Sequence, residues 1–272
     1  MSDTPAPASG RRPPELLIRA AVGLGLMAMA LAAIVLGHGI FWLVVSAMAL
    51  IMIAEWADLV GAPARDKRAA MLTLVVPLSV MSPWAWGPGW FALGIVGGSA
   101  LFVGALFRPK ALAIGMVYVG LPALALLVIR ERPEFGLVYT LWTLALVWAC
   151  DIGAYFAGKF IGGPKLAPVV SPNKTWAGLI GGLAAATLFG WIMHWEYGLA
   201  MRLTLATPVL ALLAQGGDLF ESWLKRRAGM KDSGTLFPGH GGVLDRLDGL
   251  VPVAPVAAFL VVVVPWLYVW RP

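Results

Sequence analysis

Long apolar runs recur along the whole chain, and they restrict it to a fold that lies mostly in lipid. A helix needs about 20 apolar residues to cross roughly 30 Å of hydrocarbon. Nine runs come close to this length, near residues 17–37, 39–56, 68–83, 89–107, 111–129, 137–157, 177–195, 203–220 and 249–270. Only 12% of the residues are charged, which excludes an ordinary water-soluble domain. The sequence therefore predicts an all-α, polytopic membrane protein with about nine transmembrane helices.

The chain is predicted to form a single membrane domain over residues 1–272, because no internal repeat or long linker divides it. We expect residues 1–14 to be a flexible, Pro-rich cytoplasmic segment and residues 15–150 to be an amino-terminal helical array. Residues 151–272 carry the two longest polar loops, 158–176 and 221–248, and are expected to hold the chemistry.

The positions of lysine and arginine predict how the helices are oriented, because cytoplasmic loops retain positive charge. With nine spans, sixteen of these cations fall on the side of the amino terminus and four on the other side. This asymmetry predicts a cytoplasmic amino terminus, with both long polar loops in the cytoplasm. The net charge of +6 is spread over loops that flank the membrane, so we expect no nucleic-acid partner. Anionic lipid phosphates are the more natural partners.

Asp218 is the most costly residue of the predicted spans, since it follows the apolar stretch 203–215 near the end of one of them. A carboxylate there needs a partner or a cation, which makes it a functional candidate. If the helix continues, Ser222 and Lys225 follow at i+4 and i+7 and share its face. A purely structural ion pair between Asp218 and Lys225 is the alternative.

Asp245 and Asp248 lie three residues apart at the start of the last predicted span, and thus on one face if that segment is helical. Carboxylates at a helix amino terminus also interact favourably with its dipole, which is the structural alternative. Three carboxylates at neighbouring span ends suit Mg²⁺, which prefers oxygen ligands. The neighbouring cations would complement a metal bound to polyphosphate, and they are Lys225, Arg226, Arg227, Lys231 and Arg246.

Three further segments supply weaker candidates. The turn from Pro238 to Gly242 has glycines that could turn backbone amides toward an anion, and its His240 either contacts phosphate or only fills the turn. In the other loop, Ser171 or Thr175 is expected to cap the next helix, and this leaves Lys174 as the surplus cation. Asp151 either supports the site or pairs with Lys159.

The segment 222–248 resembles the signature of phosphatidate cytidylyltransferases, also called CDP-diacylglycerol synthases. The resemblance rests on Ser222, Lys225, Arg226, Lys231, Asp232, Pro238, His240, Gly241, Gly242, Asp245, Arg246 and Asp248. Segments 151–155, 171–178 and 215–218 also look similar, so the resemblance covers roughly the last 130 residues. Ala177 departs from it, because the family usually has glutamate there. We therefore expect the loop with Ser171 and Lys174 to play a supporting role.

The resemblance implies transfer of CMP from CTP to phosphatidic acid, which gives CDP-diacylglycerol and pyrophosphate for phospholipid synthesis. Asp218 and Asp245 are expected to bind Mg²⁺, alone or with a second cation, with Asp248 nearby. Lys225, Arg226, Lys231 and Arg246 are expected to hold phosphates, while His240, Gly241 and Gly242 shape the nucleotide pocket and Ser222, Ser171 and Lys174 assist substrate binding.

The expected location is a bacterial-type inner membrane, with a cytoplasmic active site and a homodimer as a candidate assembly. Two other functions remain open. A CTP-dependent lipid kinase would use the same parts to move the γ-phosphoryl group. A transporter of anionic lipids would use the carboxylates as a proton or ion relay. Its polar residues would be expected at the membrane midplane, whereas the charges here are predicted at one face.

Overall fold

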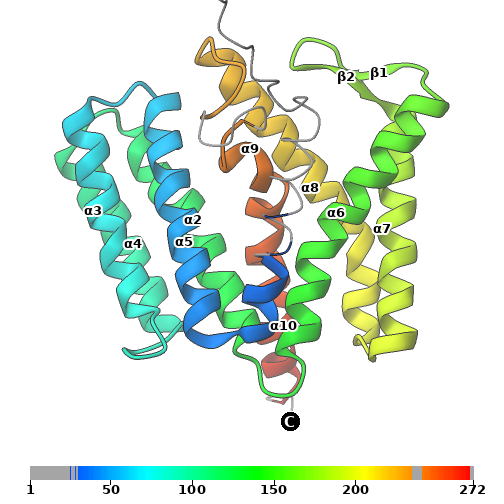
Figure 1. Ribbon diagram of the computed structural model, residues 1–272, viewed down its shortest axis with the longest axis horizontal. Coiled ribbons are helices and arrows are strands. Elements are labelled where there is room, and N and C mark those ends of the chain that lie inside the picture. The colour runs from blue at the N-terminus through cyan, green and yellow to red at the C-terminus, as the bar shows by residue number, and fades with distance from the viewer. Residues whose placement is uncertain (1–24, 26–27, 29, 235–240, 270–272) are drawn as a thin grey trace, which may run out of the picture.

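The computed structural model describes residues 25, 28, 30–234 and 241–269, and all structural statements concern these residues (Figure 1). The helices are α2 His38–Leu59, α3 Ala64–Val80, α4 Trp90–Leu106, α5 Ala111–Arg130, α6 Gly136–Phe160, α7 Trp176–Tyr197, α8 Met201–Arg227, α9 Leu244–Leu247 and α10 Leu250–Val269. Each predicted apolar run after the first coincides with one of these helices. About half of the first run lies outside the described residues.

Membrane insertion follows from the length and composition of the helices. Five of them, α2, α5, α6, α7 and α8, are long and apolar enough to cross a bilayer. Helix α4 and the stretch Leu250–Val264 of α10 are apolar but shorter. The prediction of a helical membrane protein is thus confirmed, whereas the count of nine spans and the direction of insertion stay predictions.

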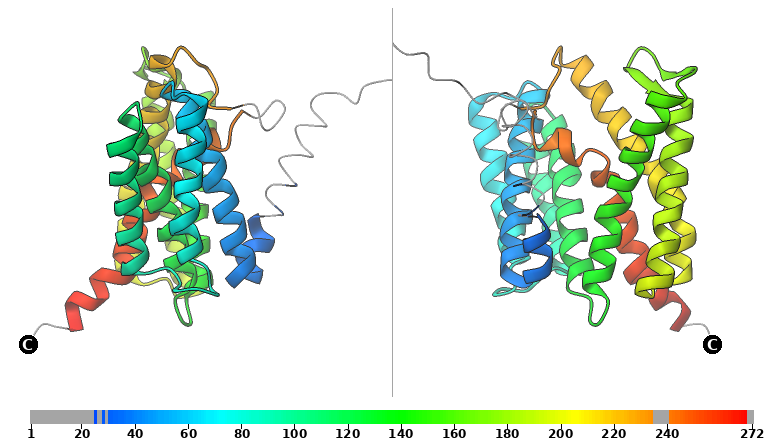
Figure 2. Two further views of the ribbon diagram at one scale, coloured as in Figure 1. Left: turned by 90° about the vertical axis from the view of Figure 1, so that its left-hand side faces the viewer. Right: turned by 45° about the vertical axis from the view of Figure 1, so that its right-hand side comes forward.

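The helices form two groups with α10 between them. Helices α2 to α5 lie on one side and α6 to α8 on the other, as the right-hand view in Figure 2 also shows. Helix α10 packs against both α5 and α8. The short helix α9 and the hairpin that joins α6 to α7 lie at the upper end in Figure 1. We call this end the site end.

The loop predicted over residues 158–176 is shorter than expected and contains a hairpin. Helix α6 continues to Phe160, and strands β1 Lys165–Ala167 and β2 Ser171–Thr175 pair antiparallel. This is a small departure from an all-α fold. Thr175 caps α7, because its Oγ1 accepts a hydrogen bond from Gly178 N at 3.0 Å, which confirms the predicted capping role.

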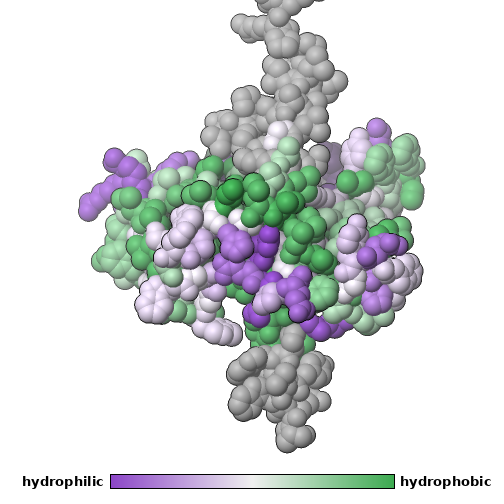
Figure 3. All heavy atoms as spheres, turned by 60° about the horizontal axis from the view of Figure 1, so that its bottom comes forward, coloured by the Kyte–Doolittle hydropathy of each residue, from purple (hydrophilic) through white to green (hydrophobic). Residues whose placement is uncertain are grey.

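Large apolar side chains cover the outer faces of the helices. Leu72 of α3 and Leu101 of α4 are 71% and 78% exposed, which is costly in water but expected in lipid. Figure 3 turns the end opposite the site forward and shows hydrophobic residues on much of the flanks, with hydrophilic residues near the centre of that end. This distribution fits a helical bundle with lipid around its sides.

Helices α6 and α7 approach each other closely because small residues face each other. A Cβ added at Gly153 would lie 2.6 Å from the carbonyl oxygen of Gly181, and one at Gly182 would lie 2.8 Å from that of Cys150. The hydrophobic effect does not drive helices together in lipid, so close packing of small residues holds them together instead. This packing fixes α6, and with it Asp151, against α7.

This packing predicts that Gly182→Ala destabilises the protein. The new methyl group would meet the α6 backbone, so the two helices must separate, at a cost of about 1–3 kcal/mol. Thermal unfolding in detergent measures the change. Gly94→Ala in α4 is the matched control, because nothing lies within 4 Å of its added Cβ. Equal melting temperatures for the two variants would contradict the close α6–α7 contact.

Candidate active site

Helix α8 carries the first cluster of polar residues to the site end. The helix continues past the predicted apolar run to Arg227, so Asp218, Ser222 and Lys225 share one face as expected. Ser222 Oγ donates a hydrogen bond to Asp218 Oδ1 at 3.4 Å, which is the predicted i+4 contact. The three side chains are partly buried, at the point where α8 leaves its apolar part.

Asp218 forms its ion pair with Lys174 of β2, at 2.6 Å, and not with Lys225. The structural Asp218–Lys225 pair that the sequence left open is therefore wrong. Spacing along α8 suggested this pair, but Lys174 from the hairpin forms the ion pair with Asp218 instead. Lys174 Nζ also donates to Gln215 Oε1 at 3.2 Å. The hairpin with Ser171 thus contributes a charged contact to this cluster despite Ala177.

Asp151 of α6 lies beside the same cluster. Gln215 Nε2 donates to Asp151 Oδ1 at 3.4 Å, while Lys159 Nζ contacts the hydroxyl oxygen of Tyr155 at 3.4 Å and lies over its ring. Of the two roles considered for Asp151, the structure favours support of the site. Gln215 connects the carboxylate of Asp151 to Lys174, and Lys174 connects it to Asp218.

Asp245 of α9 is held on several sides. Lys225 Nζ lies 2.6 Å from its Oδ1, and the N–H groups of Ser233 and Gly242 donate to its Oδ2 at 2.9 and 2.8 Å. Burial raises the pKa of Asp245, but the hydrogen bonds that it accepts outweigh burial and lower that pKa to about 2. The carboxylate is therefore ionised at any pH at which the protein would be assayed.

Asp248 follows α9 and lies close to α8. A Cβ added at Gly217 would collide with the carbonyl oxygen of Asp248, so only glycine allows this approach. Burial raises the pKa of Asp248, the negative charge of Asp218 raises it further, and a hydrogen bond from Gly249 N opposes the shift. Because Asp218 directly follows Gly217, residues 218 and 248, which are 30 positions apart in sequence, come close in the fold.

Glu221 is a site residue that the sequence analysis missed. Its side chain is only 1% exposed, and Lys225 Nζ lies 3.2 Å from its Oε1. Within the described part of the chain, neither carboxylate oxygen makes a well-directed hydrogen bond. A buried carboxylate with unsatisfied oxygens is costly unless a cation is near. Its spacing of four from Lys225 was the signal that could have found it.

Glu55 of α2 is the second residue that was missed. It is 6% exposed and accepts hydrogen bonds from Ser233 Oγ and from the N–H groups of Val243 and Leu244. Residues 15–150 were expected to form a helical array, and the chemistry was expected in residues 151–272. A single carboxylate inside an apolar run was the available signal.

The remaining predicted residues lie at the same end or outside the described residues. Arg226, Lys231 and Arg246 are exposed there. Gly241 and Gly242 are described, and a Cβ on Gly241 would lie 2.6 Å from Asp245 Oδ2. His240 lies outside the described residues, so its expected role stays a prediction.

The carboxylates are not gathered into a ready-made metal site. Among the described residues, no three His, Cys, Asp or Glu side chains form a cluster able to hold a metal ion. Lysines instead neutralise Asp218 and Asp245. The donor set nevertheless suits a hard cation, because it consists of carboxylate oxygens.

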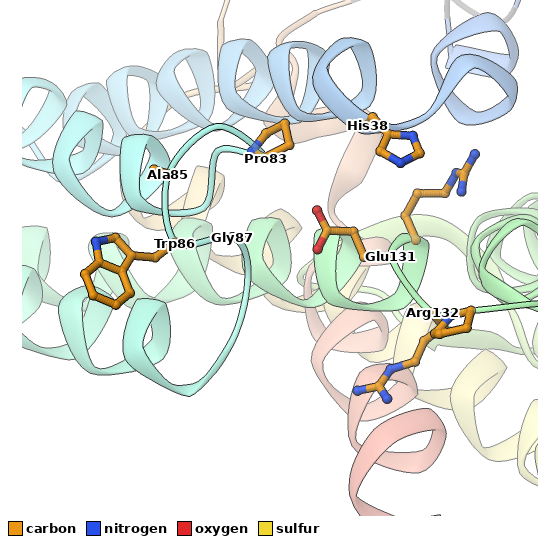
Figure 4. Close-up of a pocket in the computed structure, with 9 residues that line it drawn as sticks. His38, Pro83, Ala85, Trp86, Gly87, Glu131 and Arg132 are labelled. Carbon is orange, nitrogen blue, oxygen red and sulfur yellow. The ribbon is translucent and has the colours of Figure 1, made fainter.

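A pocket of about 500 Å³ lies at the end of the bundle opposite the site (Figure 4). Figure 4 shows Glu131 directed toward the side of Gly87, whereas Arg132 points the opposite way. Arg130, which also lines this pocket, donates to the carbonyl oxygens of Ile34 and Val35. The cations there do not converge on one point, so this pocket is separate from the candidate chemistry.

Comparison with known proteins identifies the family. Residues 17–264 match the model of the Cytidylyltransferase family. The chain is 52% identical over 146 residues to a phosphatidate cytidylyltransferase from Brucella suis biovar 1 (strain 1330), a match that covers 52% of this chain and 53% of that protein. It is 40% identical over 152 residues to one from Bacillus subtilis (strain 168), covering 55% and 56%.

These matches span about half the length of the two relatives. A phosphatidate cytidylyltransferase from Rickettsia bellii (strain RML369-C) is 39% identical over 158 residues, covering 55% of this chain and 68% of that protein. The family model reaches further and takes in the site, with Lys174, Asp218, Lys225 and Asp245. From this match over most of its length, the chain belongs to the cytidylyltransferase family.

Proposed function

We propose that this protein transfers CMP from CTP to phosphatidic acid and forms CDP-diacylglycerol and pyrophosphate. The observation that carries the proposal is the meeting of Lys174, Asp218, Lys225 and Asp245 at one end of a membrane bundle. Lys225 and Asp245 belong to the signature segment, and Lys174 and Asp218 come from segments that also look similar to the family. The names of the relatives, phosphatidate cytidylyltransferase, support the same activity.

The proposed reaction needs little help from a base. A phosphate oxygen of phosphatidic acid attacks the α-phosphorus of CTP, and the bond from that phosphorus to the bridging oxygen of the β-phosphate breaks. Pyrophosphate leaves with the electrons of this bond. The attacking oxygen is already an anion at neutral pH, so the main barrier is repulsion between two negatively charged groups. Positive charge at fixed positions lowers it.

The cations of the site end would supply this charge. Lys225 is held between Asp245 and Glu221 and so has a fixed position. Arg226, Lys231 and Arg246 are exposed beside it and would bind the phosphates of CTP. Ser222 and the hairpin residues Ser171 and Lys174 would assist substrate binding, while His240, Gly241 and Gly242 would border the nucleotide.

We further propose that Asp218, Asp245 and Asp248 hold Mg²⁺, with Glu221 as an added candidate ligand. A bound Mg²⁺ would neutralise phosphate oxygens and stabilise the leaving pyrophosphate. The burial of Glu221 and the mutual repulsion of Asp218 and Asp248 support a cation at this place. For it to bind, Lys174 and Lys225 must share their carboxylates or move toward the substrate phosphates.

The proposed setting is a bacterial-type inner membrane, with the site end in the cytoplasm where CTP is made. The lipid substrate would then approach from the cytoplasmic leaflet. The uneven distribution of lysine and arginine supports this direction. A homodimer is also proposed, and crosslinking in native membranes would test it.

Labelled CTP provides the test of the activity. The purified protein would be incubated in detergent with phosphatidic acid, Mg²⁺ and CTP labelled at either the α or the γ phosphate. We expect the α label in the lipid and the γ label in pyrophosphate. The γ label in the lipid would instead indicate a lipid kinase. Absence of both labels from the lipid would contradict either enzyme and favour a transporter.

A further inference from the structure

We infer that Glu55 of α2 is a positioning residue that holds the backbone around Asp245 in its working geometry. The inference rests on the proposed function, because Asp245 is a candidate catalytic group there. Glu55 does not belong to the segments that resemble the family signature. It reaches the site from the amino-terminal array, 190 positions before Asp245 in the sequence.

Glu55 receives three hydrogen bonds from the segment that carries Asp245. Its Oε2 accepts from Ser233 Oγ at 3.1 Å and from Leu244 N at 2.7 Å, and its Oε1 accepts from Val243 N at 2.9 Å. The side chain is 6% exposed and lies within an apolar helix. A carboxylate in such a place is costly unless donors surround it. These contacts therefore have a structural reason to persist.

Two glycines fit closely around the same carboxylate. A Cβ added at Gly234 would lie 2.5 Å from Glu55 Oε1, and one at Gly242 would lie 2.6 Å from both carboxylate oxygens. No other residue type fits at either position without displacing Glu55. Glycine at both positions is therefore explained by the approach of this backbone to a carboxylate of α2.

Asp245 and Glu55 accept hydrogen bonds from the same two stretches of the chain. Ser233 donates its hydroxyl to Glu55 and its N–H to Asp245. Gly242 donates its N–H to Asp245, and the next residue, Val243, donates its N–H to Glu55. Each N–H donor to Asp245 therefore lies in the same residue as a donor to Glu55, or in the residue next to one. Loss of Glu55 would loosen the groups that keep Asp245 in place against Lys225.

Only a glutamate satisfies all three donors. Glutamine at position 55 would present an NH₂ group to at least one N–H donor, so a buried hydrogen bond would be lost and two donors would face each other. Aspartate would keep the charge but is one methylene shorter and falls short of the donors. Both substitutions are therefore expected to loosen the segment.

The test compares Glu55→Gln with Asp58→Asn in the full chain in detergent. Asp58 lies on the same helix, is 49% exposed and pairs with Lys67, so it is the matched control. For Glu55→Gln we expect kcat to fall about tenfold to a hundredfold, as for the loss of one buried hydrogen bond near the reacting groups. KM for CTP and for phosphatidic acid should change far less. Asp58→Asn should keep the wild-type values.

Hydrogen exchange provides the readout that does not depend on activity. In Glu55→Gln, the amides of Ser233 and Gly242 should exchange faster, although their N–H groups bond to Asp245 and not to Glu55. Faster exchange at Val243 and Leu244 alone, with a wild-type kcat, would overturn the inference. This readout applies even if the wild-type protein makes no CDP-diacylglycerol, which would refute the proposed function separately.

Ser233→Ala covers the case in which Glu55→Gln does not fold. It removes one of the three donors to Glu55 and keeps the N–H group that bonds to Asp245. We expect a smaller drop in kcat and faster exchange at Gly242. Unchanged exchange at Gly242, together with an unchanged kcat, would also overturn the positioning role.

Discussion

Asp245→Asn is expected to lower CMP transfer by about 10³-fold or more, which corresponds to about 4 kcal/mol of transition-state stabilisation. Asp245 accepts hydrogen bonds from Lys225, Ser233 and Gly242 with two oxygens. Asparagine has one oxygen and one NH₂ group, so it cannot accept all three, and it carries no charge for a metal ion. The α-label assay measures the loss, and Asp218→Asn should show a comparable one.

The control for these variants is Asp66→Asn. Asp66 lies in the first turn of α3 and accepts a hydrogen bond at 3.1 Å from Arg108 N, which lies between α4 and α5. Its variant should keep wild-type turnover. All three variants should keep their helical circular dichroism in detergent. Substantial residual turnover in folded Asp245→Asn or Asp218→Asn would contradict the assignment of these carboxylates.

The lowered pKa of Asp245 determines how its contribution to the stability of the fold depends on pH. Its folded pKa of about 2 lies below the ordinary value of about 3.9 for aspartate. A carboxylate of this kind stabilises the fold fully above the ordinary value, and this stabilisation is lost as pH falls through about 2. Asp245 is therefore not the source of any loss of activity between pH 5 and pH 8.

Lys225→Met is expected to destabilise the protein by about 3 kcal/mol and to abolish turnover. The substitution leaves Asp245 without its cation and leaves the buried Glu221 without any nearby positive charge that the structure shows. Breaking a buried ion pair from one side costs far more than a surface pair contributes, because the remaining charge stays out of water. Thermal unfolding in detergent measures the loss.

A second substitution separates stability from chemistry. Lys225→Met combined with Glu221→Gln should recover part of the lost stability, because the uncompensated buried charge is removed, but it should not restore turnover. Lys159→Met is the control, since Lys159 lies over the exposed ring of Tyr155 and its loss should change stability by less than about 0.5 kcal/mol. Equal losses of stability in Lys159→Met and Lys225→Met would contradict the role of Lys225 as the cation that compensates the buried carboxylates.

The helical part of the fold could be predicted closely, because the length of an apolar run is fixed by the bilayer. The predicted runs 137–157 and 177–195 became Gly136–Phe160 and Trp176–Tyr197. Their ends moved outward, since polar residues such as Lys159 and Glu196 stay helical after the apolar stretch. The hairpin of β1 and β2 was not predicted, because three and five residues in a polar loop give no clear alternation.

The sequence could not predict which charged side chains of the site form ion pairs with each other. Helical spacing brought Ser222 into contact with Asp218, and this was predicted. The same spacing suggested Lys225 as the partner of Asp218, whereas the structure gives Lys174 to Asp218 and Asp245 to Lys225. Partners 44 and 20 positions apart depend on how α8 packs against the hairpin and α9, which no local pattern records.

The sequence by itself determined that this chain is a helical membrane protein, and it predicted that its chemistry lies near residues 218–248, because apolar length and the cost of charge in lipid are local properties. Only the tertiary structure decided that Glu221 is buried beside Lys225, since burial depends on which faces of the helices meet. It also decided that Glu55 from the amino-terminal array bonds to Ser233, Val243 and Leu244. A hydrogen bond between residues nearly 190 positions apart exists only once the helices have packed.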